Sequence, residues 1–348
     1  MMFGYAIVAV LAVCLFWLDP ILNAVAPSLV PKAPVMYRTP RPPVKESLLA
    51  LEDGDVGSGS SSCPPDAYTV HLFNKAPLVM YIENFLSLSE RQHLIEIRSV
   101  FGSPRERQEV NRFPSLRHPE DTLEADRAAS NALYEPATVT SDGGGSVQRD
   151  TIVRDSEVAI VPRTDVVRCI EARARSLQGW REDLWIERLR VQRYVAPSGH
   201  YGFHFDWSRP GTATGGWGRV SSIMVYVDDG ELNSPNEPRQ PLVGGGTYFP
   251  RVPRRSADFR WCPFINCEGD AEVEVEDEGE DGQDGYRPPQ NNTTTGVVFK
   301  PVPGNAVLWE NFRSDGTGRP FEETWHAGLR VLEGVKVGLN IWSWGRMD

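Results

Sequence analysis

A mainly β fold with supporting helices (α+β) is the fold class that this 348-residue sequence predicts. Three observations support it. Short β-branched and aromatic runs follow one another from Trp185 onward, no helix pattern separates them, and Gly and Pro are abundant between them. Several strands in succession without intervening helices are typical of a sandwich or barrel such as a jelly roll. The chain is long enough for one large β domain, since such domains run to about 250 residues.

The expected strands and helices can be placed by residue type. The strand runs after Trp185 are WIERLRVQRYV, RVSSIMVYVDD, GGTYFP, GVVFKPV, AVLWENF and GVKVGLNIWSW, and YTVHLFNKAPLVMYIENFL opens the folded part. One helix is expected after Ser87 and Glu90, which stand in capping-box relation. A second is expected in DVVRCIEARARSLQG, where apolar residues recur at three- and four-residue steps and Gly179 ends the pattern. Residues 102–150 between the helices read as a long surface loop.

The first 30 residues are expected to form a membrane anchor or a signal segment. Residues 3–18 are apolar throughout, slightly short of the roughly 17 to 25 residues of a spanning helix, and the apolar character resumes at Ile21. A cleaved signal peptide is the alternative, favoured by the small residues at 24–26 and opposed by the lack of a basic n-region. Residues 31–66 are rich in Pro, Gly and Ser and are expected to be a disordered tether.

Both interpretations of the N-terminus place the chain in the secretory pathway. We expect a single-pass endoplasmic reticulum membrane protein with its folded domain in the lumen; the alternative is a protein secreted after signal cleavage. Overlapping glycosylation sequons at Asn291 and Asn292 favour a lumenal glycoprotein. The positive-inside tendency opposes it, because basic residues follow the apolar run, namely Lys32, Arg38, Arg41 and Lys45.

Four cysteines remain after Cys14, an even number that suits a disulfide-permissive compartment. Cys262 and Cys267 are spaced to clip a loop as a disulfide, with free thiols or zinc ligation as alternatives. Cys63 and Cys169 could form a second bridge, but cysteine spacing alone does not fix the pairing.

The net charge of −11 is concentrated in one segment. Residues 268–284 contain ten acidic residues and no basic one, so the rest of the chain is nearly neutral. Such a run is typical of a solvated loop. No cluster of Lys and Arg dominates any segment, and the sequence therefore argues against nucleic-acid binding.

The segment GHYGFHFDW holds a candidate metal site. His204 and Asp206 are two residues apart, so both side chains project from one face of a strand. This pair alone is a weak signal, because His118 precedes Glu120 with the same spacing. His326 supplies a third ligand and completes the two-histidine, one-carboxylate set that binds iron and leaves positions open.

Lys336 follows ten residues after His326 in the apolar run VKVGLNIW. On an exposed face of an alternating strand it would be unremarkable, whereas burying it without a partner would be costly. A dicarboxylate cosubstrate would explain a buried lysine at this position.

Four blocks carry a family resemblance: RVQRYVAPSGHYGFHFD, GGGTYFP, KPVPGNAVLW and WHAGLRVLEGVKVGLNIW. Together they resemble the catalytic domain of the prolyl 4-hydroxylase class of iron(II)- and 2-oxoglutarate-dependent dioxygenases. The resemblance covers about residues 80 to 348 and is strongest after 185. It implies a double-stranded β-helix (jelly roll) core, and a dioxygenase domain over 67–348 that carries an acidic insertion around 252–296.

The resemblance also implies roles for single residues. His204, Asp206 and His326 would be the iron ligands and the catalytic centre, and Lys336 would pair with the distal carboxylate of 2-oxoglutarate. The remaining residues would line the cosubstrate pocket or border the metal, namely Tyr194, Thr247 and Trp342 for the pocket and Tyr201 for the metal. The implied cofactors and cosubstrates are Fe(II), 2-oxoglutarate and O2, with ascorbate as the reductant.

The expected function is hydroxylation of an unactivated C–H bond, with peptidyl proline as the substrate that the family implies. The same chemistry on another peptide residue or on a small molecule is an alternative, because family membership fixes the oxidant better than the target. A non-catalytic jelly-roll binding module of the secretory pathway is the alternative of another class. Residues 102–150 and 207–220 are expected to border the site, and the sequence indicates no oligomeric state.

Overall fold

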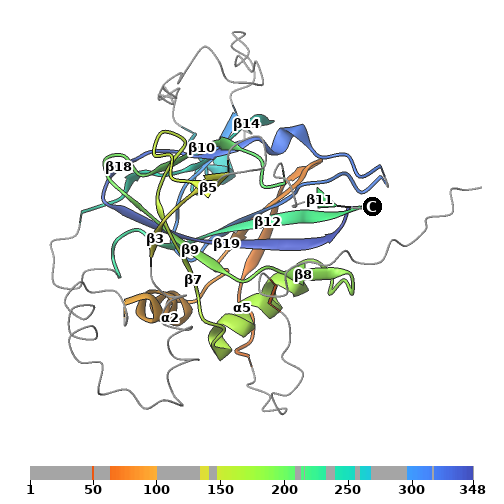
Figure 1. Ribbon diagram of the computed structural model, residues 1–348, viewed down its shortest axis with the longest axis horizontal. Coiled ribbons are helices and arrows are strands. Elements are labelled where there is room, and N and C mark those ends of the chain that lie inside the picture. The colour runs from red at the N-terminus through yellow and green to blue at the C-terminus, as the bar shows by residue number, and fades with distance from the viewer. Residues whose placement is uncertain are drawn as a thin grey trace, which may run out of the picture. The chain divides into compact units, whose positions relative to one another are not determined.

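Two antiparallel sheets form the core of the protein in the computed structural model (Figure 1). The structure describes residues 49–50, 63–99, 134–140, 147–207, 213–214, 216–232, 240–254, 259–267, 296–315 and 317–347. The major sheet has ten strands in the order β1-β2-β16-β12-β19-β9-β7-β3, with β11 beside β12 and β8 beside β19. The minor sheet has five strands in the order β15-β14-β17-β10-β6.

The helices are α2 (Leu88–Ser99) and α5 (Asp165–Ser176), with short 3-10 turns η3 (Phe259–Trp261) and η4 (Glu322–Thr324). The strands before the second helix are β1 (Thr69–Lys75), β2 (Leu78–Glu83), β3 (Glu135–Pro136), β4 (Val139–Thr140), β5 (Val147–Gln148), β6 (Arg154–Asp155) and β7 (Glu157–Ile160). Those after it are β8 (Leu184–Ile186), β9 (Arg190–Val195), β10 (His200–His204), β11 (Ala213–Thr214), β12 (Trp217–Asp228), β13 (Val243–Gly244), β14 (Thr247–Pro253), β15 (Gly296–Phe299), β16 (Ala306–Glu310), β17 (His326–Gly328), β18 (Val331–Glu333) and β19 (Val335–Arg346).

The connections between the sheets confirm the double-stranded β-helix. Successive strands β9, β10, β12 and β14 alternate between the major and the minor sheet, and β15, β16, β17 and β19 alternate again, starting with β15 beside β14 in the minor sheet. The result is four strands in each layer, β9-β19-β12-β16 facing β10-β17-β14-β15. This connectivity is that of a jelly roll, the architecture that the succession of strands predicts.

Each face of the major sheet packs against a different layer. Along β19 the alternate residues Val337, Leu339 and Ile341 are fully buried in the hydrophobic cluster that includes residues of α2 and α5. A second cluster fills part of the space between the sheets and contains Tyr226, Phe249 and Trp309. Full burial of one such side chain stabilises the fold by about 1.5 to 3 kcal/mol.

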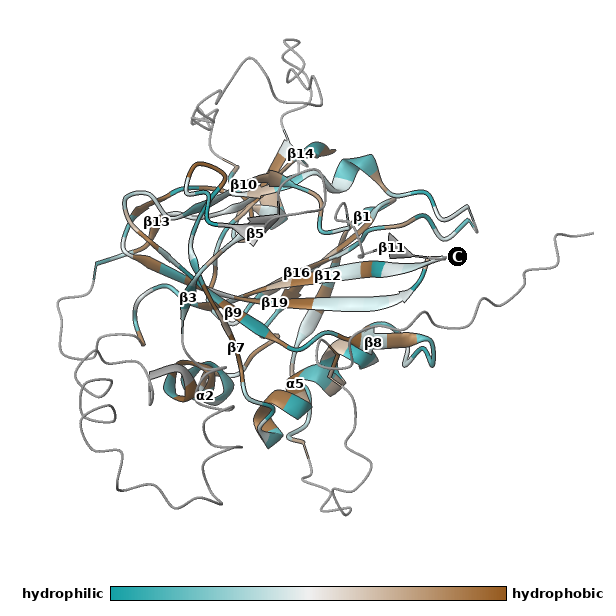
Figure 2. Ribbon diagram, in the orientation of Figure 1, coloured by the Kyte–Doolittle hydropathy of each residue, from teal (hydrophilic) through white to brown (hydrophobic). Residues whose placement is uncertain are grey.

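Both predicted helices are present, and their starts have the expected caps. In α2 the Ser87 backbone N–H donates to Glu90 Oε2 (2.8 Å) and the Glu90 N–H donates to Ser87 Oγ (3.3 Å), which is a complete capping box. In α5 the Thr164 hydroxyl accepts from the Val167 N–H (3.3 Å). Hydrophobic and hydrophilic residues alternate along α5 (Figure 2), and its apolar side packs on the major sheet.

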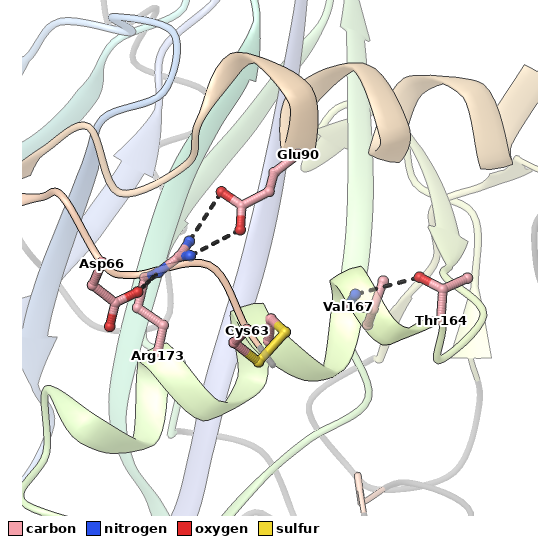
Figure 3. Close-up of a disulfide and its surroundings, with 7 residues drawn as sticks. Cys63, Asp66, Glu90, Thr164, Val167 and Arg173 are labelled. Atoms are coloured by element: carbon pink, nitrogen blue, oxygen red, sulfur yellow. Dashed lines mark hydrogen bonds and ion pairs between the residues drawn. A yellow bond between two sulfur atoms is a disulfide. The ribbon is translucent and has the colours of Figure 1, made fainter. Parts of the chain in front are cut away.

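A disulfide and an ion-pair cluster fix the start of the folded chain (Figure 3). Cys63 is bonded to Cys169 of α5. Beside this bridge, Arg173 donates to Glu90 (2.8 Å) and to Asp66 (2.5 Å), so that one buried guanidinium joins α5, α2 and the chain that enters the domain. Although burial opposes the charged form, the Arg173 hydrogen bonds hold the pKa of Glu90 below its usual range.

Several sequence-based expectations concern residues that lie outside those described. They are the anchor or signal segment 1–30, most of the tether, the acidic run 268–284, and the sequons at Asn291 and Asn292. The Cys262–Cys267 disulfide at the start of the insertion is present. Part of the predicted loop 102–150 forms the short strands β3, β4 and β5. Among the described helices, none is long and apolar enough to cross a membrane.

Candidate active site

Strand pairing brings the three predicted metal ligands together. His204 ends β10 and His326 begins β17, and the two residues lie opposite each other in the antiparallel ladder between these strands. Asp206 follows His204 by two residues. One ligand atom from each residue lies within 4.8 Å of the others. The long sequence separation between Asp206 and His326 is thus closed by one pair of neighbouring strands.

Backbone carbonyls orient both histidine rings. His204 Nδ1 lies 2.9 Å from the carbonyl oxygen of Gly202, and His326 Nδ1 lies 2.9 Å from that of Thr324. A carbonyl oxygen cannot donate a hydrogen bond, so in each ring Nδ1 carries the proton and Nε2 presents its lone pair. His204 Nε2 is 3.6 Å from Asp206 Oδ1. The two hydrogen bonds from Nδ1 to backbone carbonyls are the outer contacts that orient metal-bound histidines.

The protonation states of the set suit metal binding. Burial, followed by the nearby His204, lowers the pKa of His326 to about 4, so its ring is neutral at physiological pH. Burial works against the charged form of Asp206, yet its contacts with the two histidines hold its pKa below the usual range. Two neutral imidazoles and one carboxylate are the ligands that bind non-haem Fe(II) on one side.

A cavity opens from these ligands into the space between the sheets. It is lined by Gln192, Tyr194, Tyr201, His204, Asp206, Met224, Thr247, Trp309, His326, Gly328, Lys336 and Asn340. Polar groups converge in it from both sheets, while Met224 and Trp309 supply apolar walls. A hollow into which polar groups converge between apolar walls is typical of a small-molecule site.

Lys336 is the buried cation of this cavity. Its side chain is 2% exposed, and its Nζ donates to the Gly245 carbonyl (2.6 Å) and lies 5.2 Å from the Tyr194 ring centroid. In the described part of the chain no carboxylate lies within ion-pair distance of this ammonium group. Burial therefore lowers the pKa of Lys336 to about 7. The lysine is buried, as the dicarboxylate hypothesis requires, and is not an exposed strand residue.

Three of the four further predicted site residues line the cavity. Tyr201 stacks on His204 with 3.7 Å between ring centroids. Thr247 accepts a hydrogen bond from Tyr226 (2.9 Å), and Tyr194 is buried with its hydroxyl on Gln192. Trp342 is the exception: it does not line the cavity.

Trp342 packs against two arginine side chains. Its ring packs under the guanidinium of Arg219 at 4.1 Å and against that of Arg190 at 5.2 Å. The place of Trp342 in the cosubstrate pocket stays a prediction: its ring contacts are with these two arginines, and Arg219 also donates to the Asp206 carbonyl (3.2 Å).

Sequence reasoning missed three polar residues of the site. Gln192 and Asn340 line the cavity, and Tyr226 places its ring 5.6 Å from Lys336 Nζ. A signal for the first two was present, because they lie two residues before Tyr194 and four after Lys336 and so share the face of those residues. No local pattern distinguishes Tyr226, whose position depends on how β12 packs beside β19.

The residues present fit a metal and a dicarboxylate. The nitrogen and oxygen donors suit Fe(II), and the buried ammonium of Lys336 lacks the carboxylate that burial of a cation demands. Two histidines and one carboxylate that leave positions open are the ligand set of non-haem Fe(II) oxygenases.

Comparison with known proteins finds similarity among solved structures. No protein-family model and no curated protein matches the sequence. The viral collagen prolyl hydroxylase of Paramecium bursaria Chlorella virus-1 is 17% identical, with a TM-score of 0.40, over 77% of this chain and 96% of that one. A Pseudomonas putida prolyl-4-hydroxylase is 14% identical, with a TM-score of 0.37, over 78% and 92%. A Trichoplax adhaerens prolyl hydroxylase, solved with a hypoxia-inducible-factor peptide fragment, is 11% identical, with a TM-score of 0.39, over 77% and 83%.

Proposed function

We propose that the protein is an iron(II)- and 2-oxoglutarate-dependent dioxygenase that hydroxylates an unactivated C–H bond of a peptidyl proline. The observation that carries the proposal is the buried Lys336, which shares one cavity with His204, Asp206 and His326. A cation buried opposite a metal set calls for a ligand with two ends, one that chelates the metal and one that is an anion. 2-Oxoglutarate has both.

Each residue of the cavity has a definite part in this reaction. Bound iron, together with 2-oxoglutarate and O2, supplies the oxidising power that no side chain offers. Nε2 of both histidines and the Asp206 carboxylate would hold the metal. Lys336 would bind the distal carboxylate, with the Tyr194 and Tyr226 rings beside its ammonium group. Tyr201 stacks on the His204 ring and would help to hold it in place.

Peptidyl proline is supported by the four sequence blocks that resemble the prolyl 4-hydroxylase class. The test measures succinate release from 2-oxoglutarate by the full chain with Fe(II), with and without ascorbate, against proline-containing peptides, matched peptides with proline replaced by alanine, and no peptide. Turnover stimulated only by the proline peptides supports the proposal. Stimulation by the alanine peptides would indicate that another residue is hydroxylated. No turnover under any condition would favour the non-catalytic binding module.

We further propose that the folded domain resides in the lumen of the secretory pathway, behind an N-terminal anchor. The two disulfides support an oxidising compartment, because such bridges rarely persist in the cytosol. The test is treatment of the cell-expressed full chain with an N-glycosidase. A gel shift that disappears when Asn291 and Asn292 are both changed to Gln supports the lumen, and an unmodified chain speaks against it.

A further inference from the structure

Two arginines near the metal ligands have no carboxylate partner among the described residues. Arg154 of β6 is 8% exposed, and its Nη2 has no hydrogen-bond partner there. Its Nε donates to the neutral Ser156 hydroxyl (2.9 Å). Arg190 of β9 has its guanidinium 5.2 Å from the Trp342 ring centroid, and its buried Nε also lacks a partner. A buried guanidinium without a counter-charge is costly to maintain.

Both arginines lie beside the cavity. The Arg154 guanidinium is 4.3 Å from the centroid of the Tyr201 ring, which also stacks on His204. Arg190 lies opposite Asn340 in the ladder between β9 and β19, and Asn340 lines the cavity. Burial lowers the pKa of Arg190; the charge of Glu187 opposes this effect, and the charges of Arg219 and Arg154 add to it, so these cations are within electrostatic reach of one another.

The nearby carboxylates are already engaged. Glu187 accepts two hydrogen bonds from Arg219, at 2.7 and 2.8 Å, and Asp206 belongs to the metal set. Glu157 pairs with Arg193 at 2.7 Å. Asp155 follows Arg154 on the strand, so it projects from the opposite face, and it accepts from Ser198. Arg154 and Arg190 therefore leave an excess of positive charge at this side of the cavity.

The cavity floor thus has a cation near each end. On β19, Lys336 lies opposite Tyr194 and Asn340 lies opposite Arg190, four residues further along. At about 3.4 Å per residue the two ends are about 14 Å apart. In the proposed function Lys336 holds the single distal carboxylate of 2-oxoglutarate, so neither arginine is needed for it and both can serve a second anion.

We propose that Arg154 and Arg190 form an anion subsite for the carboxylate of an aspartate or glutamate next to the residue that is hydroxylated. This inference rests on the proposed function, since it names a feature of the peptide that the site accepts. Guanidinium groups match the planar geometry of a carboxylate and bind it with charge-assisted hydrogen bonds. The Tyr201 ring contacts both Arg154 and His204, so an acidic residue bound by Arg154 would lie near the reacting one.

The test compares peptides that differ only in charge. The probes are acetyl-Gly-Asp-Pro-Gly-amide and acetyl-Gly-Glu-Pro-Gly-amide, each with its Asn or Gln counterpart. Binding to the full chain is measured by calorimetry with Fe(II) and 2-oxoglutarate under anaerobic conditions. We expect the acidic peptides to bind about tenfold or more tightly than the amides. Arg154→Gln and Arg190→Gln should each reduce this preference, and equal affinity for acidic and amide peptides in the unchanged protein would overturn the subsite.

Arg193→Gln is the matched control, because Arg193 lies on the same strand but pairs with Glu157 on the other face. It should keep the full preference. Arg154→Lys, which retains the charge over Tyr201, should keep part of it, whereas complete loss in Arg154→Lys would indicate packing and not anion binding. Weaker 2-oxoglutarate binding with unchanged peptide preference in the Gln variants would assign the arginines to the cosubstrate and overturn the inference. Absence of succinate release would instead refute the proposed function, since peptide binding is measured without turnover.

Discussion

The two faces of the major sheet differ sharply although the same strands build them. On the helix side of β19, Val337, Leu339 and Ile341 are fully buried among other apolar side chains. On the side toward the minor sheet, the alternate residues include Lys336 and Asn340, which line the cavity. One face supplies stability and the other supplies chemistry, because successive residues of a strand point in opposite directions. Substitutions one residue apart should therefore separate the two properties.

The largest effect is expected at the metal ligands. His326→Gln removes a buried imidazole donor, and we expect Fe(II) binding by equilibrium dialysis, and with it any 2-oxoglutarate turnover, to fall below detection. The matched control is His200→Gln on the same strand as His204. Both ring nitrogens of His200 lie close to backbone carbonyls, Nδ1 to that of Ser198 and Nε2 to that of Ile152, and neither belongs to the metal set. This variant should therefore bind the metal normally. Metal binding unaffected by His326→Gln would remove that residue from the set.

The next effect tests the helix side alone. Leu339→Ala leaves a cavity in the fully buried cluster and should lower the free energy of unfolding by about 2 to 5 kcal/mol, measured in urea with both disulfides intact. The affinity for 2-oxoglutarate should stay unchanged. Leu332→Ala is the control, because that side chain is 55% exposed and its loss should cost about 0.5 kcal/mol or less. A large loss of 2-oxoglutarate affinity in Leu339→Ala would mean that the two faces are not independent.

The cavity side is tested by Lys336→Ala. Removing one charge of a buried pair typically costs about 3 to 5 kcal/mol, so 2-oxoglutarate binding should weaken at least about a hundredfold by calorimetry. The unfolding free energy should not fall, because the free protein loses an unpaired buried cation. Lys300→Ala is the control: Lys300 donates to the Cys262 carbonyl (2.8 Å) and does not line the cavity. An unchanged affinity in Lys336→Ala would contradict the role of this lysine.

The smallest effect concerns pH. The pKa of Lys336 in the free protein is about 7, so the ammonium form that binds an anion is present below this pH and is lost above it. Affinity for 2-oxoglutarate should therefore fall by up to about tenfold per pH unit from about pH 7 upward. Arginine stays charged throughout this range, so Lys336→Arg should flatten the profile whatever its affinity. A profile that is flat in the unchanged protein would show that the bound and free lysine have the same charge.

Sequence reasoning reached the parts of the fold and site that local patterns encode. The capping box of Ser87 and Glu90 is a four-residue signal, and alternating strands define their own inward faces. The metal set was found because His204 and Asp206 are two residues apart at the end of one strand, and because His326 lies in a block that the family resemblance covers. The cysteine pairing was left open by the sequence, since it depends on how α5 packs beside the entering chain.

The features that escaped prediction arise where strands distant in sequence meet. Arg154, Arg190 and Tyr226 look like ordinary strand residues, and only the sheet order places them around the cavity. Trp342 illustrates the same limit. Its block is recognised from the sequence, but only the packing of the strands shows that its ring lies against two arginines.

The carbonyl that orients each metal-binding histidine belongs to the residue two positions before it. The orientation of each ring is thus determined by a three-residue segment of backbone, Gly202–His204 or Thr324–His326, and does not depend on the chain between the two segments. The ladder between β10 and β17 supplies the only alignment that the two pieces need. The chain between the two segments can therefore be longer, as it is with the insertion after β14, without a change in the orientation of either ring.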